Sequence, residues 1–102
     1  MPTVNEVDFQ HTAERHRYKI APIEMTPSRV TPEHDHAWDI RGMVLEGRFT
    51  IDIGGSAETY GPGEVFEVPA RVVHSERHDP NGGLLLIGRR KADAACSHAG
   101  EP

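Results

Sequence analysis

Two histidines separated by a single residue, His34 and His36, are the strongest candidates for chemistry in this chain. In a β-strand, the side chains of residues i and i+2 project from the same face, so both imidazoles could bind one metal ion. A third histidine, His74, follows much further along. Three neutral imidazoles leave part of the coordination sphere of a divalent metal open, as a catalytic or ligand-binding metal requires. Because the chain contains 7 histidines, solvated or structural imidazoles are the alternative interpretation of the pair.

Short segments of apolar residues, separated by turn signals, make up most of the rest of the chain. Residues 49–53 alternate between apolar and polar side chains, which is typical of a half-buried strand. Gly54-Gly55 and Gly61-Pro62-Gly63 mark turns, and residues 84–87 are apolar on both faces, as in a buried strand. We find no amphipathic helical window. The pattern therefore predicts an all-β barrel or sandwich, whose interior could hold one small ligand.

Length and charge restrict the possible classes of protein. The 102 residues fit one domain, which we divide into an N-terminal arm (1–16), a β-domain (17–91) and a flexible C-terminal tail (92–102). The formal net charge of -5 and the lack of a basic stripe argue against nucleic-acid binding. No stretch has the apolar length of a membrane span or the pattern of a signal peptide. We therefore expect a soluble, cytoplasmic protein without a membrane partner.

Two longer segments resemble the two conserved motifs of the cupin family. Residues 34–47 resemble the first motif, in which a histidine pair is followed by a glycine turn. Residues 63–74 resemble the second motif, because the leading glycine, Pro69 and the final His74 stand at the corresponding positions. Both motifs occur in the right order, and residues 27–88 resemble a single small cupin domain. The resemblance implies a jelly-roll β-barrel. It also implies a divalent metal ion (Fe, Mn, Zn or Ni) held by His34, His36 and His74.

The first segment departs from the cupin pattern at the fourth metal ligand. Counting back from Gly47, the position that usually holds glutamate or glutamine is Ile40, which cannot bind a metal. Asp39 and Arg41 flank it, and the strand register or a bulge could turn either side chain inward. Asp39 would then be a fourth ligand or would orient a histidine, whereas Arg41 would bind a substrate carboxylate. Alternatively, these two residues pair with each other or with solvent on the outer face.

Several further residues near the motifs need an interpretation. Trp38 is close enough in sequence to the histidines to line a pocket. Arg71 stands where the second motif usually has glycine, which indicates an altered turn. We interpret the charged residues Glu67, Glu76 and Arg77 as a solvated face.

These features are compatible with functions of different classes. The first is a metal-dependent enzyme, namely a dioxygenase, isomerase or lyase, that acts on a small oxygenated acid held by Arg41. The second is a non-catalytic small-molecule-binding or sensor protein with the metal as an anchor, and a purely structural protein is the third. We expect a homodimer, since small cupins commonly pair and covering an exposed edge strand is favourable. The fold does not select a substrate.

Overall fold

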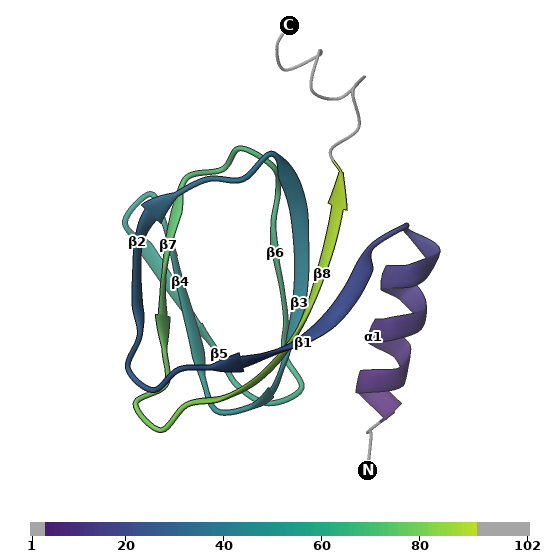
Figure 1. Ribbon diagram of the computed structural model, residues 1–102, viewed down its shortest axis with the longest axis horizontal. Coiled ribbons are helices and arrows are strands. Elements are labelled where there is room, and N and C mark those ends of the chain that lie inside the picture. Colours follow the sequence, from purple (N-terminus) through teal and green to yellow (C-terminus); the bar gives the residue numbers. More distant parts are fainter. Residues whose placement is uncertain (1–3, 92–102) are drawn as a thin grey trace, which may run out of the picture.

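The computed structural model describes residues 4–91, and the predicted tail at residues 92–102 lies outside them. Within this range the elements are α1 (Val4–Arg15), β1 (Lys19–Met25), β2 (Val30–His34), β3 (Trp38–Glu46), β4 (Phe49–Ile53), β5 (Ser56–Tyr60), β6 (Val65–Val68), β7 (His74–His78) and β8 (Gly83–Lys91). The strands form two antiparallel sheets that face each other, ordered β1-β8-β3-β6 and β2-β7-β4-β5 (Figure 1). The all-β class is confirmed. The prediction of a barrel is wrong in one respect, because the two sheets do not close on each other through strand pairing.

The core lies between the two sheets, and β3 shows how its residues are divided between faces. Ile40 and Val44 are buried in this core, whereas Met43 belongs to a second apolar cluster on the outer face of the same sheet. Successive side chains of a strand point to opposite faces, so even-numbered residues of β3 point inward. The core between the sheets consists of Met25, Ile40, Val44, Phe49, Ile51, Phe66, Val68, Leu85 and Ile87.

Helix α1 covers the outer face of the β1-β8-β3-β6 sheet (Figure 1). Phe9 and Ala13 are four residues apart and therefore lie on the same side of the helix, where they are 4% and 0% exposed. Phe9 packs against Met43 and Leu86. The predicted arm at residues 1–16 is thus mostly helical, and no helix was expected there. Few apolar residues mark the helical period in α1, so its burial depends on contacts with distant strands. Among residues 4–91, no helix has both the length and the apolar character needed to cross a membrane.

Replacing Phe9 by alanine is expected to lower the free energy of unfolding by about 3 kcal/mol, because a buried aromatic ring is removed from between the helix and the sheet. Urea denaturation followed by circular dichroism would measure this loss. Val7→Ala is the matched control, since Val7 lies on the same helix and is 41% exposed. Equal stability of the two variants would contradict the packing of α1 on the sheet.

Candidate metal centre

The three predicted histidines come together at one end of the two-sheet domain. His34 ends β2 and is the direct partner of His74, the first residue of β7. His36 lies after the end of β2, in the connection to β3, so the two neighbouring histidines are not on one strand as their spacing predicts. The ring centroids are nevertheless 4.7 Å apart for His34 and His36, 4.3 Å for His34 and His74, and 5.3 Å for His36 and His74.

Backbone carbonyl groups fix the orientation of two of these rings. Nδ1 of His34 lies 2.8 Å from the carbonyl oxygen of Pro32, and Nδ1 of His74 lies 2.9 Å from that of Val72. A carbonyl oxygen can only accept a hydrogen bond, so each Nδ1 carries the proton and donates it. In the neutral rings, the lone pair is therefore on Nε2. A hydrogen bond of this kind orients metal-binding histidines in proteins.

Glu76 completes the cluster, although the sequence suggested a solvated side chain. Its Oε2 lies 3.0 Å from Nε2 of His74 and 3.6 Å from Nε2 of His34, and the side chain is 20% exposed. One ligand atom from each of His34, His36, His74 and Glu76 lies within 4.8 Å of the others. Nε2 and a carboxylate oxygen attract each other at this distance when a proton on Nε2 is donated to the oxygen or when a cation is bound by both atoms. This donor set therefore fits a divalent metal ion.

The surroundings of His36 favour its neutral, metal-binding form. Burial lowers the pKa of His36, and the neighbouring His34 and His74 lower this pKa further. Trp38 stacks on the ring, with centroids 4.9 Å apart and planes inclined by 16°.

The amide of Arg71 donates a hydrogen bond of 2.7 Å to the carbonyl oxygen of His36. Arg71 has a φ of 67°, in the left-handed region that favours glycine, so the altered turn keeps the backbone conformation that a glycine would adopt there.

The structure places Asp39 and Arg41 on the outer face of the β1-β8-β3-β6 sheet, away from the histidines. Ile40 between them is 8% exposed and belongs to the core between the sheets, so its two neighbours point the other way. The register shift in the pairing of β3 with β8 lies between Val44 and Glu46, so no bulge turns residues 39 to 41 around. Of the two alternatives, the outer-face position of Asp39 and Arg41 is therefore the one found, and neither side chain points inward.

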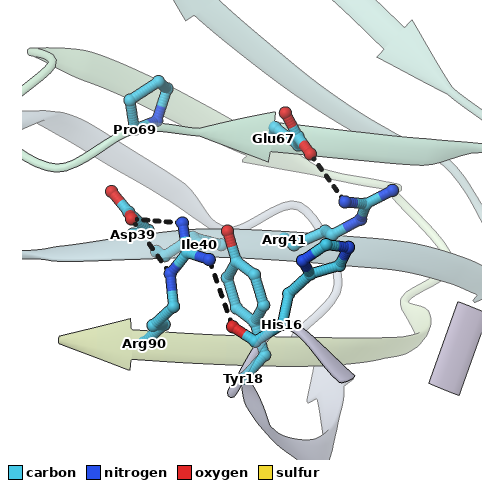
Figure 2. Close-up of a pocket in the computed structure, with 8 residues that line it drawn as sticks. All are labelled: His16, Tyr18, Asp39, Ile40, Arg41, Glu67, Pro69 and Arg90. Atoms are coloured by element: carbon cyan, nitrogen blue, oxygen red, sulfur yellow. Dashed lines mark hydrogen bonds and ion pairs between the residues drawn. The ribbon is translucent and has the colours of Figure 1, made fainter. Parts of the chain in front are cut away.

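Asp39 and Arg41 instead form ion pairs on this outer face (Figure 2). Asp39 Oδ2 lies 2.8 Å from Nη2 of Arg90, and Nη1 of Arg41 lies 3.0 Å from Oε2 of Glu67. Oδ1 of Asp39 accepts a hydrogen bond of 2.8 Å from the amide of Ala70, which anchors the turn that leads to His74. The residues around a pocket of about 300 Å³ on this face are His16, Tyr18, Asp39, Ile40, Arg41, Glu67, Pro69 and Arg90.

Fold and site together define a small two-sheet protein with a candidate metal centre at one end. A model of the cupin domain matches residues 23–86, which is more than half of the chain, and the protein therefore belongs to the cupin family. The predicted family is confirmed. No curated protein matches the chain.

Solved structures agree with this assignment. A protein of unknown function from Rhizobium leguminosarum is 25% identical, with a TM-score of 0.67 over 74% of this chain and 71% of that chain. An RmlC-like cupin from Shewanella frigidimarina is 24% identical, with a TM-score of 0.64 over 78% of this chain and 70% of that one. A chain from the structures of the DMSP lyases RdDddP and RnDddQII is 19% identical, with a TM-score of 0.65 over 76% of this chain and 40% of that chain. The last two similarities concern the fold alone.

Proposed function

We propose that the protein is a metal-dependent enzyme that acts on a small oxygenated, carboxylate-bearing molecule. The observation that carries this proposal is the convergence of four ligand atoms, from His34, His36, His74 and Glu76, within 4.8 Å. The fixed Nδ1 atoms of His34 and His74 support it, since they direct Nε2 of both rings toward Glu76 and leave it as the ligand atom for a metal ion. A fold shared with lyases at 19% identity does not by itself transfer an activity.

Each residue of the centre has a definite task in this proposal. A divalent metal, when bound, supplies a Lewis acid that polarises an oxygen atom of the substrate. The three imidazoles would hold the ion without adding charge, and the Glu76 carboxylate would offset part of its positive charge. Trp38, which is 38% exposed and stacked on His36, offers an apolar surface to a ligand. A homodimer and a cytoplasmic location stay predictions.

Metal titration of the full-length, chelator-treated protein tests this proposal. With Zn²⁺, Mn²⁺, Fe²⁺ and Ni²⁺ added in turn, we expect at least one of them to bind with a stoichiometry of one ion per chain. Binding to the folded state should raise its stability by about 2.7 kcal/mol at a free metal concentration of 100 times Kd. Elemental analysis and thermal unfolding measure both effects.

Three outcomes are distinguishable in this experiment. Product formed from small hydroxy or keto acids by the metal-loaded protein would support an enzyme. Ligand-induced stabilisation of the loaded protein without any product would instead indicate the alternative, a non-catalytic binding or sensor protein. Failure of all four metals to bind would contradict a metal centre at these residues.

A further inference from the structure

The inner face of the β1-β8-β3-β6 sheet ends in a row of three cationic side chains. Leu85 and Ile87 of β8 are buried in the core between the sheets, and Arg89 and Lys91 follow at the same alternating positions. These two side chains therefore leave the strand on its inner face. Lys19 of β1 is the direct register partner of Arg89. Opposite residues of an antiparallel pair share a face, so Lys19 joins the row.

This cationic row lies at the same end of the domain as the candidate metal centre. Arg89 is the register partner of Ile40, the residue in the position of the usual fourth ligand of cupins. Lys91 is the partner of Trp38, which stacks on His36. The strand register thus places Arg89 and Lys91 on the inner face, beside the first residues of β3, which begins two residues after His36.

The three cations of the row differ from the arginines of the outer face in their partners. Arg41 and Arg90 are each paired with a carboxylate, whereas no ion pair of Lys19, Arg89 or Lys91 is found between residues 4 and 91. Three adjacent positive charges repel one another, and this occurs in a chain whose formal net charge is -5. An anion bound between them would relieve this repulsion.

We propose that Arg89, flanked by Lys19 and Lys91, binds a carboxylate of the substrate and thereby determines specificity. A guanidinium group binds a carboxylate through two parallel hydrogen bonds. The inference rests on the proposed function, because it takes the metal centre to hold the other end of the same molecule. The chemical class is therefore a small acid with a carboxylate at one end and a second oxygen donor at the other. Arg89 replaces Arg41, which the sequence suggested for this role.

Isothermal titration of the full-length protein with simple dicarboxylates tests the inference. Malonate and succinate are the probes, and the neutral malonamide and succinamide are their uncharged analogues. At least one diacid is expected to bind, and Arg89→Gln is expected to weaken that binding by about tenfold or more, because a charge-assisted hydrogen bond is lost. The diamides should bind at least about tenfold more weakly than the diacids. Arg89→Lys should recover part of the affinity.

Arg48→Gln is the matched control, because it removes the same charge from an exposed arginine in the turn beyond β3, at the other end of the domain. Each variant is titrated with Zn²⁺ as well, and Arg89→Gln should bind this metal as the wild type does. Titration of the diacids into metal-free protein separates the proposed metal centre from the proposed carboxylate site. If a diacid binds to metal-free protein and Arg89→Gln weakens this binding, carboxylate binding by Arg89 is supported even if no metal binds. Equal effects of Arg89→Gln and Arg48→Gln, or no diacid binding in either form, would overturn it.

Discussion

Replacing His34 by alanine is expected to weaken metal binding by at least about 100-fold, since even the hydrogen-bond partners of metal ligands are commonly worth 10- to 100-fold in affinity. His34 contributes one of three imidazoles, and its Nε2 is one of the two that lie close to Oε2 of Glu76. Without it, only three of the four donors of the cluster remain to bind a divalent ion. Elemental analysis after dialysis and titration with Zn²⁺ would measure the loss, and any metal-dependent turnover should disappear with the metal.

Two further variants make this result specific. His11→Ala removes an exposed histidine of α1 and should leave metal affinity unchanged. Glu76→Gln keeps all three imidazoles but removes the negative charge, so a smaller loss of about tenfold is expected. Circular dichroism of metal-free His34→Ala checks that the fold is retained. Wild-type metal affinity in His34→Ala would rule out the centre described above.

The strands of the fold were predictable because their residues alternate in a way that only a two-faced sheet explains. In β4 the apolar residues 49, 51 and 53 alternate with polar ones, and Phe49 and Ile51 are indeed in the core. Helix α1 was missed because, from Glu6 to Arg15, only Phe9 and Ala13 are buried apolar residues. Its position depends on Met43 and Leu86, which lie on strands far away in the sequence. Whether the two sheets close into a barrel depends on which strands pair with each other, and the local sequence pattern does not show this.

The site was predictable where a motif spans it and not where it depends on contacts between strands. The three histidines follow from their place in two motifs. Glu76 was not predicted because the first motif, which usually carries the fourth ligand, does not contain it, and the carboxylate comes from β7 instead. The spacing His74-x-Glu76 repeats the spacing of His34 and His36, and this was the available signal. Arg89 became a candidate only when its pairing with Ile40 was known.

The same pairing of strands makes Gly42 a position where a single methyl group should be strongly destabilising. Gly42 of β3 is the register partner of Phe66 of β6, and the Phe66 ring covers the glycine. A Cβ added to Gly42 would lie 2.2 Å from Cζ and 2.6 Å from Cε1 of Phe66. The ring cannot easily move, since its centroid is 5.1 Å from that of Phe49 and 5.5 Å from that of Tyr60. We expect Gly42→Ala to lower the free energy of unfolding by about 3 kcal/mol, as overpacked cores do.

Urea denaturation of four variants, namely Gly42→Ala, Phe66→Leu, the double variant and a control, would isolate this steric effect. Gly61→Ala is the control, because its added Cβ would lie 3.7 Å from the nearest atom, Oε1 of Glu64, and the substitution should be close to neutral. The double variant Gly42→Ala/Phe66→Leu should lose less stability than the sum of the two single changes, since the smaller side chain makes room for the methyl group. Strict additivity would mean that the ring does not oppose the methyl group. Gly42 follows Ile40 on the inner face of β3. If the packing of Phe66 on Gly42 holds this strand in register beside the histidines, folded Gly42→Ala should also bind a metal ion more weakly than the wild type does.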